Sequence, residues 1–235
     1  MATQPLVDPD RTPFLERMPA SSRDAVLVKS ATIRYRAGSV AFQPGDSEFA
    51  AILVTGFARS YLMSAEGRQT TIRYLHTGEL MGSLFIMGLT VEGFAQMVTD
   101  SSVINLDLAS VRRRLDVDPA VGEALAMDLA LRYAHTVRTL AVQTFGTVVQ
   151  RVAFDLLERA CRAQLASGLL QAKVSHQDLA DGIGSVRQVV TRALADLRER
   201  GLIETTPGSV TITKPAALEH LAFANLPWSR ASPVT

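Results

Sequence analysis

The chain has 235 residues, of which 47% are hydrophobic and 20% are charged, and its formal net charge is +1. These values predict a globular protein with room for two domains, and they exclude nucleic-acid binding through a polybasic surface alone. The single cysteine, Cys161, excludes an internal disulfide and an iron–sulfur cluster held by four cysteines of one chain. No apolar run approaches the ~20 residues of a membrane span, and no secretory signal precedes the first patterned segment. We therefore expect a cytoplasmic protein without a membrane partner.

Residues 31–117 have the pattern of an all-β domain, after a lead-in at 1–30 in which Phe14 to Lys29 predicts short helical turns. Turn-forming glycines recur every eleven residues, and β-branched or aromatic segments lie between them, which indicates a sandwich or barrel. Equal gaps can arise by chance among 15 glycines, but the strand patterns between them favour the β interpretation. The glycines are Gly45, Gly56, Gly67 and Gly78, and the expected strands lie near 31–40, 51–54, 59–63, 70–75 and 98–106.

A long helix is predicted at 118–146. Asp118 caps its start, and Pro119 stands at the first helical position, where its missing N–H costs nothing. Two apolar faces require two burial partners: the β domain on one side and the same helix of a second subunit on the other. Burial of both faces within one chain is the alternative, and Gly146 is a candidate hinge. One face comprises Val121, Leu125, Leu129, Tyr133, Val137 and Leu140, and the other Met127, Leu131 and Ala134.

Two short helices around a Gly-containing turn are predicted within residues 174–200. Ser175 caps the first helix, and Asp178 follows three residues later. The second helix is expected from Ser185 to Arg200, with a capping box between Ser185 and Gln188. Its apolar stripe consists of Val186, Val189, Val190, Ala193, Leu194 and Leu197.

The second helix has a polar face near its N-terminal end. A helix packed on one side with such a face on the other suits entry into a DNA major groove. An ordinary amphipathic surface helix is the alternative. The next segment favours the first interpretation, because 203–213 predicts a β-hairpin around Pro207, and two helices with a hairpin form a winged helix. The polar face comprises Arg187, Gln188, Thr191 and Arg192.

These patterns divide the chain into five parts. They are the lead-in at 1–30, the β domain at 31–117, the long helix at 118–146, the winged helix at 147–216, which begins with an amphipathic helix, and a tail at 217–235. The tail is expected to be only partly ordered from Leu218 onward.

This order of parts resembles the CRP/FNR family of bacterial transcription regulators. The resemblance covers about Ala31 to Ala216, and it is most specific at 174–203, where the pattern is hydroxyl-x-Gln-Asp-Leu-Ala-x5-Ser-x-Arg-Gln-x3-Arg-x-Leu…Gly-Leu-Ile. It implies an α+β fold with an N-terminal antiparallel β-roll of the jelly-roll type, related to cyclic-nucleotide-binding domains. A dimerisation helix and a C-terminal winged helix-turn-helix would follow. It further implies a sequence-specific transcription regulator that binds palindromic double-stranded DNA as a homodimer, with RNA polymerase as a partner.

The resemblance also assigns candidate DNA contacts. Arg187, Gln188 and Arg192 take the positions that contact base edges, and their chemistry agrees, because Arg pairs with guanine and Gln with adenine. The candidates for phosphate contacts that fix the register are Ser175, His176, Gln177 and Thr191.

The resemblance weakens at the effector pocket. Nucleotide-binding members have a Glu for the ribose where this chain has Ser83, and an Arg for the phosphate shortly before the position of Ala95. No Arg precedes Ala95, and Phe94 adds apolar bulk. Because nothing in this stretch would neutralise a cyclic phosphate, we expect that cAMP and cGMP are not the effectors. The candidate pocket residues are Gly78, Glu79, Leu80, Gly82, Ser83, Phe94 and Ala95.

No cofactor or metal ligand set follows from the sequence. The four histidines are scattered without ligand spacing. His76, near a turn of the β domain, is the candidate axial ligand for a haem-responsive alternative, although surface or hydrogen-bonded histidines are more frequent. Cys161 is expected to be a small buried side chain instead of a redox switch.

The sequence also bears on two other classes of protein. A metal-dependent enzyme on a β-barrel needs clustered histidines and a carboxylate, which the sequence lacks, so no enzymatic activity is expected. A protein-interaction module whose winged helix binds protein instead of DNA is the alternative from a different class.

Overall fold

The computed structural model describes residues 13–90, 92–160 and 170–226. The chain divides into two compact units, one formed by Asp10–Met63 and Ile72–Thr136 and the other mainly by Val137–Thr235. Cys161, which we expected to be buried, lies outside the described residues.

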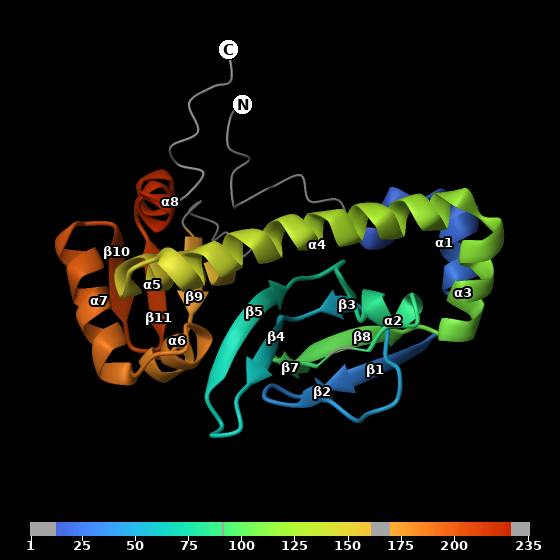
Figure 1. Ribbon diagram of the computed structural model, residues 1–235, viewed down its shortest axis with the longest axis horizontal. Helices are drawn as coiled ribbons and strands as arrows, with labels where there is room; N and C mark the ends of the chain where they lie inside the picture. The colour runs from blue at the N-terminus through green and yellow to red at the C-terminus, as the bar shows by residue number, and fades with distance from the viewer. Residues whose placement is uncertain (1–12, 91, 161–169, 227–235) are drawn as a thin grey trace, which may run out of the picture. The chain divides into compact units, whose positions relative to one another are not determined.

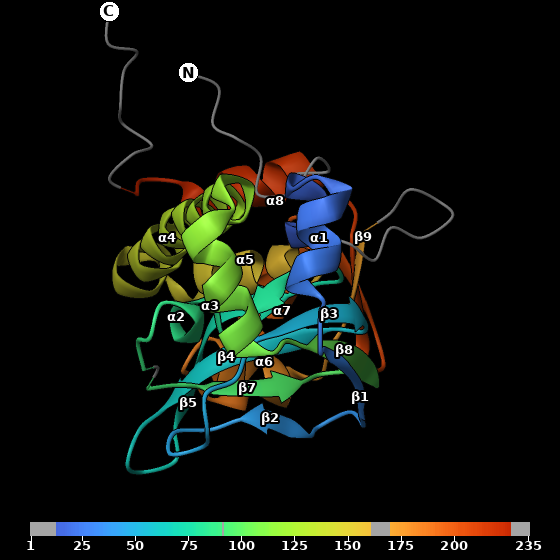
Figure 2. The same ribbon diagram turned by 90° about the vertical axis from the view of Figure 1, so that its right-hand side faces the viewer.

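The first unit begins with two short helices, η1 (Phe14–Arg17) and α1 (Ala20–Val26). They confirm the helical turns predicted for this segment. Helix α1 packs beside α3 (Leu108–Val117), which follows the last strand of the unit (Figure 2). Phe14 and Val26 are buried in this packing.

Two four-stranded antiparallel sheets form the β-roll that follows (Figure 1), which confirms the predicted antiparallel β domain. The apolar sides of both sheets supply one core cluster, which includes Leu53, Leu75 and Met97. The first sheet has the order β1 (Ala31–Tyr35), β8 (Ser101–Asn105), β3 (Ala51–Thr55) and β6 (Leu80–Met81). The second has the order β2 (Val40–Phe42), β7 (Phe94–Met97), β4 (Ala58–Met63) and β5 (Gln69–Leu75).

The regularly spaced glycines do lie at turns. Gly45, Gly56, Gly67 and Gly78 have φ values of 93°, 100°, 79° and 86°, a region that glycine enters without a steric penalty. Some short elements were not predicted, namely β6, β7, α2 (Ser83–Ile86) and α3. Strands and helices of two to four residues are too short to produce a hydrophobic period, which accounts for β6, β7 and α2 but not for α3 with its ten residues.

Helix α4 (Pro119–Phe145) is the longest element, with 27 residues. The carboxylate of Asp118 accepts a hydrogen bond from the backbone N–H of Ala120 at 3.2 Å, so the predicted start is confirmed. Val121 and Leu125 are buried against the roll and the N-terminal helices. Within the described residues, no helix is both long and apolar enough to cross a membrane.

The second unit is a winged helix with one hydrophobic core (Figure 1). Helix α5 (Val148–Ala160) precedes strand β9 (Leu170–Lys173), the helix pair α6 (His176–Gly182) and α7 (Arg187–Glu199), and the hairpin β10 (Ile203–Thr206) and β11 (Ser209–Ile212). Strand β9 completes a sheet with the order β10-β11-β9, and helix α8 (Pro215–Phe223) follows.

Three expectations for this unit are wrong. Helix α7 begins at Arg187 with Val186 as its N-cap and no side-chain capping bond, so the capping box predicted at Ser185 does not form. Val186 is exposed and does not belong to the apolar stripe. The partial order expected from Leu218 is also wrong for residues 218–226, because α8 buries Leu218 and Leu226 follows it into the core.

Candidate nucleic-acid interface and roll cavity

Local hydrogen bonds fix the start of helix α6. The Ser175 hydroxyl accepts from the backbone N–H of Asp178 at 3.1 Å, and the Asp178 carboxylate accepts from the Ser175 N–H at 3.0 Å. This reciprocal pair is the capping box of the motif. The same Ser175 hydroxyl donates to Asp178 at 2.7 Å, so it is already engaged within the chain.

Helix α7 presents the predicted polar face to solvent. Val190, Leu194 and Leu197 are buried in the core of the unit. The opposite side of the first two turns is exposed, so the structure brings the predicted base-contacting residues together on one surface. These exposed residues are Arg187, Gln188, Thr191 and Arg192.

A hydrogen-bonded chain joins helices α6 and α7 at this surface. The Thr191 hydroxyl donates to the carbonyl of Arg187 at 2.9 Å, and its oxygen lies 2.9 Å from Nδ1 of His176. The single hydroxyl proton of Thr191 can serve only one of these two acceptors, so with Arg187 as its partner Nδ1 of His176 is the donor. Gln177 is exposed next to this pair and donates to Asp181 at 2.8 Å.

A buried ion pair, which sequence reasoning missed, fixes helix α6 on helix α5. Arg159 donates to the carboxylate of Asp155 at 2.7 Å and to the carbonyl of Asp178 at 3.0 Å. The side chains of Arg159 and Asp155 are 4% and 5% exposed. A buried charge pair is costly to break, so this contact holds α6, and through it α7, in a defined orientation on the winged helix. The spacing of four residues between Asp155 and Arg159 was the available signal.

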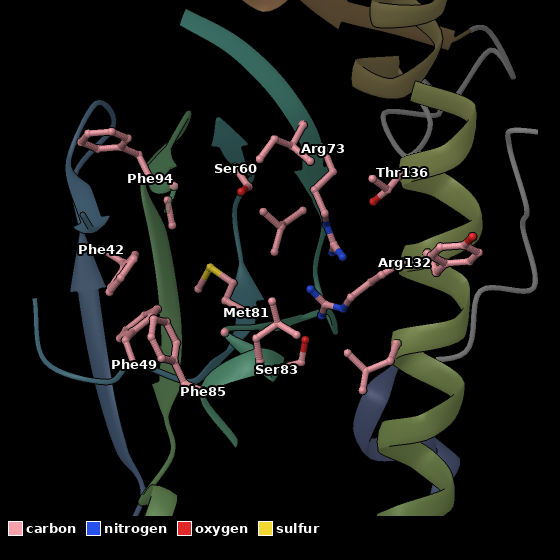
Figure 3. Close-up of a pocket in the computed structure, with 18 residues that line it drawn as sticks. Phe42, Phe49, Ser60, Arg73, Met81, Ser83, Phe85, Phe94, Arg132 and Thr136 are labelled. Atoms are coloured by element: carbon pink, nitrogen blue, oxygen red, sulfur yellow. The ribbon is translucent and has the colours of Figure 1, made fainter. Parts of the chain in front are cut away.

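The β-roll unit contains a cavity of about 440 Å³ between the second sheet, helix α2 and helix α4. One side is aromatic: Figure 3 shows the rings of Phe42, Phe49 and Phe85 close together, with Phe94 apart from them on the same side of the cavity. The ring of Phe42 packs against Phe49 at 6.4 Å and edge-on to Phe85 at 4.9 Å between centroids. Phe94 stacks on Tyr61 at 5.0 Å. The aromatic wall is therefore packed before any ligand enters.

The other side of the cavity holds two arginines that point toward each other, Arg73 from β5 and Arg132 from α4 (Figure 3). Arg73 forms a buried ion pair with Glu79. Arg132 forms an ion pair with Asp128, four residues earlier on α4, and donates to the carbonyl of Leu80. Each guanidinium is thus matched by a carboxylate.

Four of the seven residues predicted for the effector pocket line this cavity: Gly82, Ser83, Phe94 and Ala95. The other three lie behind its wall. Gly78 packs on Pro13, Glu79 pairs with Arg73, and Leu80 is buried in the neighbouring core. Two positive charges at the cavity, those of Arg73 and Arg132, were not expected from the motif, because both positions are distant from it in sequence.

His76 does not line the cavity. It is buried, and its ring lies 4.9 Å from that of Phe57. Among the described residues, no group of three or more His, Cys, Asp or Glu side chains could hold a metal ion.

Comparisons with known proteins assign both units. Residues 32–118 match the model of the cyclic nucleotide-binding domain, and residues 150–221 match that of the Crp-like helix-turn-helix domain. The chain is 33% identical over 198 residues to the cyclic AMP receptor protein of Thermus thermophilus, covering 80% of this chain and 87% of that protein. It is 29% identical to the global nitrogen regulator of a Nostoc species, over 76% of this chain and 83% of the relative. A crystal structure of a CRP/FNR-family transcriptional regulator from Thermus thermophilus superposes with a TM-score of 0.68 at 26% identity, covering 82% of this chain and 98% of that one.

Proposed function

The chain belongs to the CRP/FNR family of DNA-binding transcription regulators, and from this we propose that it acts as a homodimer on a palindromic DNA site. In this proposal the β-roll is the sensor, helix α4 is the dimer contact, and RNA polymerase is the partner that the family resemblance implies. The observation that supports it most directly is the exposed polar face on the first two turns of α7.

The dimer is supported by an apolar strip along α4 that one chain leaves uncovered. Tyr133, Val137 and Leu140 recur at steps of four and three, so they share one side of the helix, and Met127 and Phe145 flank that side. Large exposed apolar surfaces of this kind are typical of interaction sites. A second copy of α4 would cover the strip, because in a two-fold symmetric dimer the same residues of both helices contact each other. The exposed residues of the strip include Met127, Tyr133, Val137, Leu140 and Phe145, which are 48%, 74%, 41%, 64% and 65% exposed.

We propose that Arg187, Gln188 and Arg192 contact base edges in the major groove. His176 is proposed for a phosphate contact at the start of α6, and Thr191 supports it by holding the His176 ring, since the hydroxyl proton of Thr191 already goes to the Arg187 carbonyl. Gln177 belongs to the same set, whereas Ser175 contributes mainly through its backbone because its hydroxyl is bonded to Asp178. In a dimer the two α7 helices would enter successive major grooves ~34 Å apart.

The sensor would act through α4. Leu129, Arg132 and Thr136 of this helix line the roll cavity, so a bound molecule contacts the dimer helix directly. An effector that binds one arrangement of the helix more tightly than another shifts the population toward it. We further propose that cAMP is not this effector, since both cavity arginines are matched by carboxylates.

Selection of bound sequences from random DNA, followed by gel-shift titration, tests this function. We expect an inverted repeat, and we expect Arg187→Ala and Arg192→Ala each to weaken discrimination for guanine by ~1–3 kcal/mol. Arg200→Ala is the matched control, because Arg200 pairs with Asp196 near the other end of the helix. Affinity should fall steeply with salt. Unchanged binding by both variants, or a flat salt response, would contradict DNA recognition by this face and favour a protein partner.

A further inference from the structure

We propose that the roll cavity binds a largely apolar, ring-bearing molecule that ends in one neutral carbonyl oxygen, and not a nucleotide. This inference deepens the proposed sensor function and rests on it. The cavity volume of about 440 Å³ lies within the range of small-molecule sites, which is about 300–1,000 Å³.

The aromatic wall determines the body of the ligand. Phe42, Phe49 and Phe85 pack on one another, and Phe94 is held by Tyr61, whose other contact is the guanidinium of Arg59, 4.5 Å from the ring centroid. Rings that are already fixed lose little conformational entropy on binding. They offer faces and edges to another ring, an arrangement that adds to the gain from apolar burial. A nucleobase would also gain from this wall, so the exclusion of a nucleotide depends on its phosphate.

Arg132 determines the polar end. Its Nε and Nη2 groups bond to Asp128, and Nη2 also reaches the carbonyl of Leu80. Within the described residues the hydrogen bonds of this guanidinium come from those two nitrogens, so the N–H groups of Nη1 are available for an acceptor in the cavity. The hydroxyl-bearing residues Ser60, Ser83 and Thr136 also line the cavity. One oxygen acceptor in the ligand is therefore enough to bond with the N–H groups of Nη1 at this end of the cavity.

The balance of charge disfavours a phosphate. Arg73 and Arg132 supply two positive charges, and Glu79 and Asp128 supply two negative charges. A phosphodiester would have to displace a carboxylate from its guanidinium or remain uncompensated in a partly buried site, and either event is costly. A neutral carbonyl group, such as a ketone, attached to an apolar body needs only a hydrogen bond from Nη1, whereas a carboxylate brings the same single negative charge as a cyclic phosphodiester.

The test is displacement of a neutral apolar dye, 1-N-phenylnaphthylamine, from the full chain, followed by fluorescence. The competitors are 4-phenylbutyrate, its methyl ketone analogue 5-phenylpentan-2-one, and cAMP. We expect the ketone to displace the dye at lower concentration than the acid does, and cAMP at the same concentration to leave the dye bound. If the acid displaces the dye at lower concentration than the ketone, the charge argument and the neutral ligand class are overturned. Failure of the ketone, or displacement by cAMP as effective as that by the ketone, also overturns the inference.

Two variants locate the binding. Arg132→Lys keeps the charge opposite Asp128 but removes Nη1, so it should weaken both phenyl compounds about tenfold and leave dye affinity unchanged, because the dye lacks a carbonyl. Arg34→Lys, at an exposed site on β1, is the matched control and should change neither. Phe94→Ala should weaken the dye and the phenyl compounds alike. Equal effects of Arg132→Lys on dye and competitors would contradict the assignment of the polar end.

Gel-shift titration of the same protein separates this inference from the proposed function. Specific DNA binding without displacement overturns the ligand class and leaves the regulator intact. Displacement without specific DNA binding overturns the proposed function and leaves the ligand site intact.

Discussion

Gly82 determines how closely two parts of the cavity wall approach. It is the N-cap of α2 with φ of 72°, and a Cβ at this position would lie 1.8 Å from the carbonyl oxygen of Phe49. We expect Gly82→Ala to lower the free energy of unfolding by about 2 kcal/mol or more, because strain and a backbone clash add. Urea denaturation of the purified protein measures the loss.

Gly88→Ala is the control for this substitution. Gly88 has nearly the same backbone angle, φ of 74°, but nothing lies within 4 Å of its missing Cβ. It should therefore lose only the cost of the left-handed conformation, about 1–2 kcal/mol. Equal losses at Gly82 and Gly88 would show that Phe49 moves aside without cost.

Single residues also mark the limit of prediction from sequence. Ser83 and Phe94 could be assigned to the cavity because a local motif places them there, and the structure brings both to its wall. Arg73 and Arg132 could not be assigned to the cavity, because they belong to a strand and a helix that are far apart in the chain and meet only in the fold. The pairing of Asp128 with Arg132 at i,i+4 on an otherwise apolar helix side was the one local signal.

At the scale of helices, the two serines of the DNA-binding motif make a matched pair. Ser175 caps α6 through Asp178, whereas Ser185 precedes the N-cap of α7, which has no side-chain capping bond. We expect Ser175→Ala to lower the free energy of unfolding of the winged helix by about 1 kcal/mol. Ser185→Ala should leave it almost unchanged. Thermal denaturation followed by circular dichroism compares them, and a larger loss at Ser185 would contradict the cap assignment.

The elements that sequence predicted well share one property, a period long enough to detect. Helix α4, the strand-and-glycine alternation of the roll and the stripe of α7 all extend over many residues. Helix α8 was missed although Pro215 stands at its first turn, the same signal that located α4. Its nine residues are apolar nearly all round, because α8 packs into the core on α5, so no polar face marks it as a helix.

At the scale of the whole molecule, the apolar strip of α4 predicts concentration-dependent assembly. Leu140 is 64% exposed within one chain, so Leu140→Asp should leave the fold intact while placing a charge at the centre of the proposed contact. We expect monomers by sedimentation velocity and much weaker DNA binding, since the two half-sites are no longer bound together. Leu62→Asp, at an exposed site on β4 that is 44% exposed, is the control. A dimeric Leu140→Asp protein would refute this contact.

Tyr133 lies where the ligand cavity and the proposed dimer contact meet. It lines the roll cavity, and it is also the most exposed member of the α4 strip, at 74%. In a symmetric pair the same side chain would border its own cavity on one edge and the partner's helix on the other. A molecule that fixes Tyr133 would then alter the contact that this side chain makes with the partner's helix. We expect binding to the first cavity of the proposed dimer to change the affinity of the second, so that saturation departs from a simple hyperbola.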